Sequence, residues 1–536
     1  MQKSTLKITK EKFLKGKRGF AMKRNLKKRV ISFILFFVMI LGLTPIISLP
    51  VNAKNNGFLI EPTKDAVPIN AIHIKTATEL AAIGGEQSEG KYYVLDNDIN
   101  LSDEWVPVDD FRGTFNGQGH SISNLYVLES SNRKYAGLFG SVIGNVKITD
   151  IAVNIGKQGI NASSNNSEFY AGGLIGYIYG SNTTVTIENC YTTGNINASS
   201  SSSYGRAYAG GLIGSTYPYY SNFATPIITI TIENCYTTGN VSALSSSSDA
   251  CAGGLVARVE DIRITINNSY ATGYISSSYE AGGLVGVGGA WTTIKNCYST
   301  GDVFSYCLAG GLICTAVGTV IENCYAKGDI TVANYDSSGY AGGLIGTCTG
   351  VAYISMSNRY SVIITNCYAT GNVSASSSSL STDTYAGGLI GYTYNASSAS
   401  IKIVITNCYS KGNITVSAST PYAGGLIGYE SNNLTLTGNY RYSTQIIQRL
   451  DENRNYVGGA TNEIGTPLTD AQMKDKSSFN GWNFDTVWGI NSDINNGYPY
   501  LTRVSQIAKG KAKKWRKMEK KRLKSVLPNK IIKIYN

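Results

Sequence analysis

One short phrase, Ala-Gly-Gly-Leu followed by Ile or Val, recurs eight times through the middle of the chain. A second phrase, Asn-Cys-Tyr, follows each of the first seven copies, and in the third of these it reads Asn268-Ser269-Tyr270. Successive copies begin 28 to 45 residues apart, which is too short for an independent domain and indicates an array of stacked units. The eight copies begin at Ala171, Ala209, Ala252, Ala281, Ala309, Ala341, Ala386 and Ala423, and a weaker copy begins at Ala136.

Each copy has the composition of short β-strands. The copy at Ala281 contains three apolar or alternating segments, at 283–287, 292–298 and 302–306, with Gly, Asn and Asp between them. The chain has 59 Gly and 37 Tyr, which are weak helix formers, and 28 residues are too few for a propeller blade. We therefore predict an all-β fold, a right-handed parallel β-helix (β-solenoid) of about eight or nine rungs, because each rung buries its inner face only by stacking on its neighbours.

The N-terminal residues have the features of a secretory signal. Residues 1–53 begin with a basic region, continue with an apolar stretch at 30–47, and end with small residues, Val51 and Ala53, near a cleavage position. This order is typical of a signal peptide. An uncleaved membrane anchor is the alternative, because about 18 apolar residues approach the minimum for a membrane span.

The charge separates the ends of the chain from its body. The net charge is +12 for the whole chain, but it is +11 for residues 1–53, −11 for 54–502 and +12 for 503–536. The predicted domains are a signal peptide at 1–53, opening rungs at 54–134, the repeat β-helix at 135–430, a C-terminal closing segment or cap at 431–502 and a basic tail at 503–536.

The closing segment contains a predicted short helix and several aromatic residues. Thr469 and Gln472 have the spacing of a capping box at the start of a helix at 469–474. We expect the aromatic residues to cover the exposed edge of the last rung. These residues are Trp482, Phe484, Trp488 and Tyr500.

Equivalent residues of a β-solenoid stack about 4.8 Å apart. Six of the ten cysteines share one repeat position, so we expect a buried column of small apolar side chains rather than disulfides. The Asn before each of these cysteines is expected to form an amide ladder at a turn. Four cysteines lie outside the column: Cys251, Cys307, Cys314 and Cys348. Of these, Cys307 could form a disulfide with Cys314 or Cys348. The column consists of Cys190, Cys235, Cys297, Cys324, Cys367 and Cys408.

Tyrosine and serine also recur at fixed positions. The tyrosines are predicted either to bind sugars as an aromatic strip or to pack between rungs, and both interpretations stay open. Serine-rich segments at 199–203, 245–248 and 376–379, together with insertions at 217–225 and 352–361, are expected on one face. The tyrosines before Ala-Gly-Gly are Tyr135, Tyr170, Tyr208, Tyr340, Tyr385 and Tyr422.

Few residues offer catalytic chemistry. The two histidines, His73 and His120, are far apart in sequence and form no His-Glu-x-x-His motif. The acids before Asn-Cys-Tyr, at Glu188, Glu233 and Glu322, share a position that Lys or Thr fills in other copies, so they indicate a surface. We predict no enzyme and assign no catalytic, cofactor-binding or metal residues; the alternative is a polysaccharide-processing β-helix that uses carboxylates. Weak calcium binding is conceivable at Asp96, Asp98, Asp103 and Asp109.

The repeated phrases resemble the GLUG motif. The resemblance lies in residues 170–176 and 188–195, is supported by flanking segments at 78–122 and 481–501, and covers about 72–501. Such repeats occur in bacterial secreted and surface proteins, including the non-catalytic part of IgA-specific metallopeptidases and haemagglutinin-like adhesins. The resemblance implies a non-enzymatic scaffold for adhesion, or for glycan or host-surface binding.

The expected partners follow from this location and from the charge. They are extracellular glycans or host or surface proteins, and anionic cell-wall polymers through the basic tail. We expect no nucleic-acid partner, since the body is acidic, and no stable membrane span after cleavage of the signal. The expected location is extracellular, either secreted or at the cell surface.

Overall fold

The computed structural model describes residues 66–505 except for short internal stretches, and these residues lie in the compact unit Pro62–Asn536. The predicted signal peptide and nearly all of the predicted basic tail lie outside the described residues. The internal stretches outside the description are 129–133, 165–167, 204, 218–227, 247–248, 260–261, 290, 336, 351–360, 380–381, 396–401 and 431–433.

Each repeat copy forms five short strands, where the sequence predicted three. In the copy at Ala281 the strands are β25 (Glu280–Gly282), β26 (Val285–Gly288), β27 (Thr292–Lys295), β28 (Tyr298–Ser299) and β29 (Val303–Ser305). The chain bends at Gly283-Leu284 and again at Asn296, whose backbone φ of 54° is left-handed. Asn tolerates this conformation. The repeated Asn therefore forms a corner of the solenoid and divides the predicted strand at 292–298 into β27 and β28.

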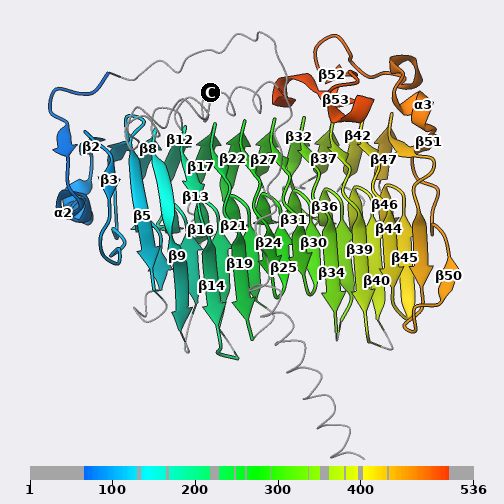
Figure 1. The fold of residues 1–536 in the computed structure, drawn as a ribbon, viewed down its shortest axis with the longest axis horizontal. Coiled ribbons are helices and arrows are strands. Elements are labelled where there is room, and N and C mark those ends of the chain that lie inside the picture. Colours follow the sequence, from blue (N-terminus) through cyan, green and yellow to red (C-terminus); the bar gives the residue numbers. More distant parts are fainter. Residues whose placement is uncertain are drawn as a thin grey trace, which may run out of the picture. The chain divides into compact units, whose positions relative to one another are not determined.

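Four sheets result, and within them the described strands pair in parallel except for β50 (Tyr456–Gly458), which runs antiparallel to β49 (Ile447–Leu450). Successive copies follow one another along the stack in chain order (Figure 1). The all-β fold with parallel sheets is confirmed. The right-handed sense of the helix stays a prediction.

Sheet 1 has twelve strands. In the repeat copies, its strand comes after the position of the insertions at 217–225 and 352–361. It contains β1 (Ile72–Ile74), β2 (Tyr92–Leu95), β4 (Thr114–Asn116), β8 (Asn145–Thr149), β12 (Thr184–Glu188), β17 (Thr229–Glu233), β22 (Arg263–Asn267), β27, β32 (Val320–Glu322), β37 (Val362–Thr365), β42 (Ile403–Thr406) and β47 (Leu434–Thr437).

Sheets 2 and 3 lie before and after the Gly-Gly bend, with nine strands each. Sheet 2 contains β6 (Tyr135–Ala136), β10 (Phe169–Gly172), β15 (Ala207–Gly210), β20 (Ala250–Gly253), β25, β30 (Leu308–Gly310), β35 (Gly339–Gly342), β40 (Asp383–Gly387) and β45 (Thr420–Gly424). Sheet 3 contains β7 (Phe139–Val142), β11 (Ile175–Tyr179), β16 (Ile213–Tyr217), β21 (Val256–Val259), β26, β31 (Ile313–Val317), β36 (Ile345–Gly350), β41 (Ile390–Asn395) and β46 (Ile427–Tyr429).

Sheet 4 begins at the tyrosine after the column cysteine. It contains β3 (Ile99–Asn100), β5 (Ser121–Val127), β9 (Ala152–Ser164), β13 (Tyr191–Thr193), β14 (Ile196–Ser200), β18 (Tyr236–Thr237), β19 (Val241–Ser245), β23 (Tyr270–Ala271), β24 (Ile275–Ser277), β28, β29, β33 (Tyr325–Ala326), β34 (Ile330–Asn334), β38 (Tyr368–Ala369), β39 (Val373–Ser377), β43 (Tyr409–Ser410), β44 (Ile414–Ser417), β48 (Tyr440–Tyr442), β49, β50 and β51 (Thr466–Leu468).

The cysteine column is confirmed. All ten cysteines are buried and free, so the suggested pairing of Cys307 is not formed in this structure. The Cys297 thiol donates to the Lys295 carbonyl at 3.1 Å, and the Cys297 backbone N–H donates to the Cys324 sulfur at 3.4 Å. Ser269 fills one place with a 2.7 Å bond from its hydroxyl to the Asn267 carbonyl. The thiols therefore act as small buried groups with weak local hydrogen bonds.

The predicted amide ladder forms between some of the copies. The side-chain amide of Asn366 donates to the Asn323 side-chain oxygen at 3.0 Å, and Asn323 donates to Asn296 at 3.4 Å. Toward the N-terminus the acceptor is a carboxylate, because Asn189 donates to Asp150 at 3.1 Å. The ladder thus links copies at one corner of the solenoid.

The closing segment has two parts. Strands β50 and β51 extend sheet 4 beyond the last copy, and α3 (Asp470–Met473) begins with the predicted Thr469–Gln472 capping box. The rest of the segment, with β52 (Trp488–Gly489) and β53 (Tyr500–Leu501), folds back along the side of the stack (Figure 1). Trp488 lies 6.1 Å from the Tyr368 ring and 6.2 Å from the Tyr409 ring, which belong to successive copies. This aromatic side chain therefore packs along the repeats instead of over the final edge.

At the other end, α2 (Ala77–Ala81) precedes the first full turns and buries Leu80 completely. Its capping box joins the Thr76 hydroxyl and the Glu79 carboxylate to each other's backbone N–H groups. Within the described residues, the short 3₁₀ helices are Glu86–Ser88, Lys476–Ser478 and Asn495–Gly497.

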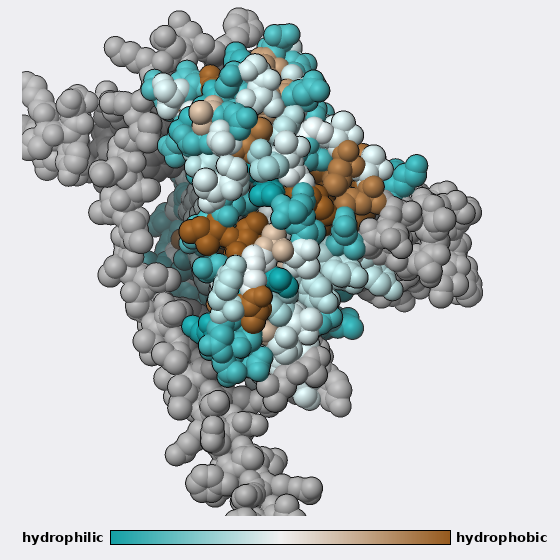
Figure 2. Space-filling view, turned by 90° about the vertical axis from the view of Figure 1, so that its right-hand side faces the viewer, coloured by the Kyte–Doolittle hydropathy of each residue, from teal (hydrophilic) through white to brown (hydrophobic). Residues whose placement is uncertain are grey.

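The C-terminal end of the stack is largely hydrophilic, with separate hydrophobic patches (Figure 2). Large apolar side chains exposed near this end include Ile446, Tyr456 and Val457. Tyr456 and Val457 belong to β50, the antiparallel edge strand.

Candidate functional site

Two columns of outward side chains meet at the corner between sheets 2 and 3, and we call them together the outer corner strip. The first column is the residue before Ala-Gly-Gly, and the second is the residue two positions after the Leu-Ile or Leu-Val pair. The first column is Tyr135, Tyr170, Tyr208, Cys251, Glu280, Leu308, Tyr340, Tyr385 and Tyr422. The second is Ser141, Tyr177, Ser215, Arg258, Val287, Thr315, Thr347, Tyr392 and Tyr429.

Rings from the two sheets contact each other across the corner. The centroids of Tyr170 and Tyr177 are 4.7 Å apart, and those of Tyr385 and Tyr392 are 4.8 Å apart. In the copy that contains Tyr392, the residue before the second column is Gly391. Sheet 2 approaches this residue so closely that a Cβ there would lie 2.7 Å from the Ala341 carbonyl oxygen, so the position requires glycine. The outer faces of the two sheets therefore turn toward each other, and this brings two columns of side chains into one strip.

The strip is aromatic toward both ends and charged in the middle. First-column tyrosines of successive copies pack against each other, so the predicted packing between rungs is confirmed, and sugar binding stays a prediction. Three copies of this column carry other residues. Cys251, Glu280 and Leu308 replace tyrosine in the first column, and Arg258 stands beside them in the second. Aligning the copies on Ala-Gly-Gly and looking for a charge at the tyrosine position would have identified Glu280 from the sequence.

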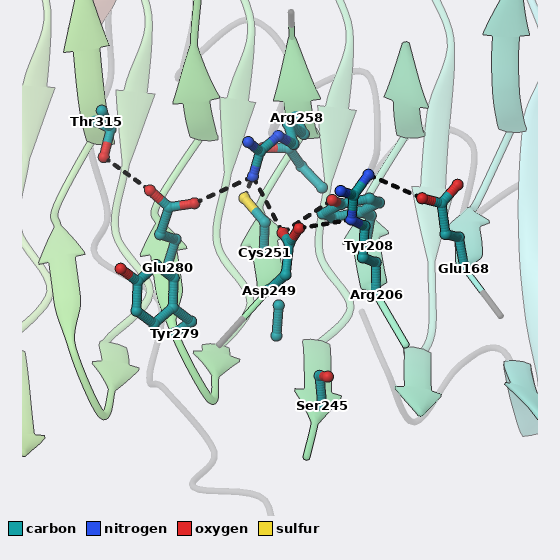
Figure 3. Close-up of polar contacts among 12 residues, drawn as sticks. Glu168, Arg206, Tyr208, Ser245, Asp249, Cys251, Arg258, Tyr279, Glu280 and Thr315 are labelled. Atoms are coloured by element: carbon teal, nitrogen blue, oxygen red, sulfur yellow. Dashed lines mark hydrogen bonds and ion pairs between the residues drawn. The ribbon is translucent and has the colours of Figure 1, made fainter. Parts of the chain in front are cut away.

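The charged residues form a chain of alternating sign across four copies, the charged cluster, drawn in Figure 3. Arg206 contacts Glu168 and Asp249, each at 2.8 Å, and Arg258 contacts Asp249 at 3.3 Å and Glu280 at 3.5 Å. The cluster joins consecutive copies by ion pairs in a partly buried place, where they are screened less than at an open surface.

Tyrosine hydroxyls complete the cluster. The Tyr170 hydroxyl donates to Glu168 at 2.5 Å and the Tyr208 hydroxyl donates to Asp249 at 2.9 Å. Burial, and next the hydrogen bond to Glu168, raise the pKa of Tyr170 far above its ordinary value. Burial likewise raises the pKa of Tyr208. Both hydroxyls are therefore neutral donors at physiological pH.

The alternative of carboxylate catalysis finds its best pair here. Asp249 and Glu280 belong to successive copies, as paired acids on adjacent rungs would require. Each carboxylate, however, is held by the Arg258 guanidinium, and Glu280 also accepts a bond from the Thr315 hydroxyl at 3.1 Å. The Glu280 side chain is only 11% exposed. This geometry suits a structural ion pair better than proton transfer to a sugar leaving group.

The histidines lie in the first turns of the stack, each beside an aspartate. His73 contacts Asp96 at 2.7 Å, and His120 lies 3.5 Å from Asp98, in the turn before β5. The hydrogen bond from His73 is the largest cause that lowers the pKa of Asp96.

The aspartates suggested for calcium have separate partners. Asp103 accepts from Ser102 at 2.7 Å and Asp109 lies 3.5 Å from the Ser141 hydroxyl. Within the described ranges, no group of three or more His, Cys, Asp or Glu side chains is arranged to hold a metal ion. Calcium binding stays a prediction.

The serine-rich segments leave the stack at one corner. Ser200 and Ser245 are register partners at the ends of β14 and β19. Ser377 ends β39 and pairs with Asn334. Most of the two predicted insertions, 217–225 and 352–361, lies outside the described residues.

The second set of tyrosines forms a separate column, which we call the tyrosine stack. From Tyr191 to Tyr409, neighbouring rings are 4.6 to 5.0 Å apart along the column. In its C-terminal half the hydroxyls are covered by the closing segment; Tyr409, for example, donates to the Pro499 carbonyl at 2.7 Å. The stack consists of Tyr191, Tyr236, Tyr270, Tyr298, Tyr325, Tyr368, Tyr409 and Tyr440.

The parallel stack of repeat copies defines a β-solenoid repeat protein. The family model of the GLUG motif matches residues 277–303, 305–331 and 382–415. The chain therefore carries GLUG motifs in its repeat copies, as its sequence suggested.

The chain is 34% identical over 79 residues to a "Putative Gly-rich membrane protein" of Evansella cellulosilytica, and this match covers 14% of the chain and 8% of that protein. A crystal structure described as a "putative immunoglobulin A1 protease from Bacteroides ovatus" aligns over 81% of this chain and 92% of that one, with 18% identity and a TM-score of 0.28. In the described part of this chain, none of the helices has the length and apolar character to cross a bilayer.

Proposed function

We propose that this protein is a secreted or cell-surface, non-enzymatic repeat protein whose outer corner strip binds extracellular glycans or host or surface proteins. Its GLUG motifs support an extracellular repeat scaffold. The in-register columns support binding, since they repeat one surface feature along the stack.

The observation that carries the proposal is the group of tyrosines at the C-terminal end of the strip. Tyr385 and Tyr422 are stacked at 4.9 Å, and Tyr392 and Tyr429 at 5.3 Å. Tyr429 is 39% exposed and Tyr392 and Tyr422 are half-buried, whereas Tyr385 is buried beneath them, so the accessible rings are the other three. Rings of this kind offer an apolar face to a sugar ring and a hydroxyl to its polar groups. The aromatic pairs thus form a surface with both kinds of contact.

A glycan array probed with the full chain tests this function. The expected result is selective binding to one class of glycan, with the bound glycan recovered intact. Soluble degradation products from the bound polysaccharides would instead support the carboxylate enzyme. Binding to none of the glycans, or of a panel of host and surface proteins, would contradict the proposal.

The basic tail contributes a second contact. Residues 503–536 carry a net charge of +12, and a charge of this density attracts anionic cell-wall polymers. Retention on isolated cell walls should therefore fall at low salt when these residues are deleted. Unchanged retention would contradict the role of the tail.

A further inference from the structure

The outer face of sheet 4 carries one aromatic residue in a column of polar ones. Phe304 lies on β29, and its register partners on the neighbouring strands are Ser276 and Thr331. None of the other described members of this column is aromatic, so the sheet itself does not require an aromatic side chain at Phe304. These members are Asn161, Asn197, Ser242, Ser276, Thr331, Ser374, Thr415 and Gln448.

Three tyrosines gather around Phe304, and we call the four rings the sheet 4 aromatic patch. Phe304 and Tyr306 meet edge to face with their centroids 5.2 Å apart, and the Tyr306 and Tyr335 centroids are 5.7 Å apart. Burial, and next the proximity of Asp302 and Tyr306, raise the pKa of Tyr274 to about 12. Tyr335 is 48% exposed and the other three rings are half-buried. The patch therefore offers tilted aromatic surfaces to the outside of the stack.

Two exposed aspartates border the patch, and both belong to a ladder between copies. The Asp329 backbone N–H donates to the Asp302 carboxylate at 2.8 Å, and the Asn372 N–H donates to Asp329 at 2.7 Å. One copy later the Asn413 N–H donates to the Asn372 side-chain oxygen at 3.0 Å. An amide oxygen thus serves the ladder as well as a carboxylate does, so the ladder does not need the two negative charges.

These charges have no cation in the described part of the chain. Neither Asp302 nor Asp329 takes part in an ion pair with a described side chain. Asp302 comes two residues before Phe304 on the same strand. The surplus negative charge and the aromatic rings therefore occur together, in the same two copies.

We propose that the sheet 4 aromatic patch, with Asp302 and Asp329, binds a quaternary ammonium group. Such a cation is attracted to the faces of aromatic rings, and the two carboxylates complement its charge. It has no N–H group, so it needs rings and charge rather than hydrogen-bond acceptors. This site is separate from the outer corner strip, which lies between sheets 2 and 3.

The connections beside the patch are short. Strand β29 ends at Ser305 and β30 begins at Leu308, so only two residues join them. The serine-rich segments at 245–248 and 376–379 belong to copies on either side of this one. A cationic group carried by a larger molecule therefore approaches the rings between the longer connections.

Titration of the full chain with choline, followed by ligand-observed NMR, tests the site. We expect saturable binding of choline and about tenfold weaker binding of its neutral tert-butyl isostere, because the isostere lacks the charge. Phosphocholine is titrated in parallel. Tighter binding of choline supports a free base as the ligand, and tighter binding of phosphocholine supports a phosphate-linked one. Equal binding of choline and the neutral isostere, or no binding of choline, would overturn the proposal.

Two variants remove the recognised features and keep residue types that neighbouring copies already carry. Phe304→Ser gives the column the residue type of its register partner on β24. The double variant Asp302→Asn and Asp329→Asn gives the ladder the amides of the following copies. Both variants should keep the melting temperature and bind choline severalfold more weakly.

Asp493→Asn is the matched control, since Asp493 is exposed in the closing segment, and it should bind choline as the unchanged chain does. Full affinity in either patch variant would contradict the assignment of the site. So would loss of choline binding in the double variant Tyr392→Ala and Tyr429→Ala, because it would place the cation on the outer corner strip.

Discussion

At the residue scale, the repeat constrains each position through the copy above and the copy below. The column of thiols shows this most clearly: Cys297 accepts a bond from Ser269 N–H and sits beside Cys324, all inside the core. A side chain at such a position must be small and neutral, because a charge there would have no water and no partner.

Replacing Cys297 by Asp tests this constraint. We expect a loss of stability on the order of 3–5 kcal/mol, because the carboxylate would be buried without a partner. Cys297→Ser is the matched control and should cost much less, since Ser269 fills the same column. Thermal melting checks both variants, and an unchanged melting temperature for Cys297→Asp would contradict the register of the solenoid.

The glycine under the outer corner strip is constrained by space. A Cβ at Gly391 would lie 2.6 Å from the Gly346 carbonyl oxygen, whereas a Cβ at Gly288 would have its nearest neighbour at 3.4 Å, on a threonine side chain. We predict that Gly391→Ala destabilises the protein by about 1–3 kcal/mol through overcrowding, and that Gly288→Ala is tolerated. Urea unfolding measures both; equal midpoints would show that sheets 2 and 3 do not approach as described.

At the scale of the element, the strands have no stability of their own and depend on in-register neighbours. Ala281 pairs with Ala309, and Glu280 with Leu308, so each copy of the sheet 2 strand has an equivalent one turn later. Each copy chiefly contacts the copies on either side of it. One whole copy can therefore be removed if its two neighbours can then pair in the same register.

Deleting residues 281–308 removes one full copy and joins Glu280 to Ala309, which takes the register position of Ala281. We expect the shortened chain to fold with one cooperative thermal transition close to that of the whole chain. Deleting 281–294 removes only part of the copy and should prevent folding of the neighbouring turns, since it breaks the register. Circular dichroism during heating compares the two. Similar behaviour of both deletions would contradict in-register stacking.

The sequence predicted the columns well and the corners poorly. The repeated phrases gave the positions of the cysteines, the asparagines and the tyrosines before Ala-Gly-Gly. They did not show that Gly283-Leu284, the start of one predicted strand, is a bend preceded by a further strand, or that Asn296 divides another predicted strand, because a bend depends on backbone conformation and not on the apolar pattern. Nor could they place Arg258 beside Glu280 or Trp488 beside Tyr368, since these contacts arise only when separate segments meet.

At the scale of the whole molecule, stability depends on many buried groups that stay protonated. Burial raises the pKa of the thiols of Cys190, Cys251, Cys314, Cys324 and Cys367 well above the ordinary value. Because the pKa is higher in the folded state than in the unfolded state, these groups stabilise the fold fully at low pH. Their contribution is lost as the pH rises above the unfolded value.

We therefore predict that the free energy of unfolding falls as the pH rises above about 8.5, by up to ~1.4 kcal/mol per thiol for each pH unit. Urea unfolding between pH 7 and pH 10 measures this change. A variant with Cys314 and Cys348 replaced by Ala should lose less stability across this range. A free energy that stays constant to pH 10 would contradict the burial of the thiols.

The central claim is that tyrosines of neighbouring copies form one binding surface, the outer corner strip. The most direct test is the affinity of the full chain for its best glycan, measured by titration calorimetry for the double variant Tyr392→Ala and Tyr429→Ala. Tyr456→Ala is the matched control, since Tyr456 is 66% exposed on β50, outside the strip. The account predicts that the double variant loses most of the affinity, roughly 1–3 kcal/mol for the lost stacking, while the control binds as the unchanged chain does. Full affinity in the double variant, with its melting temperature preserved, would contradict the claim.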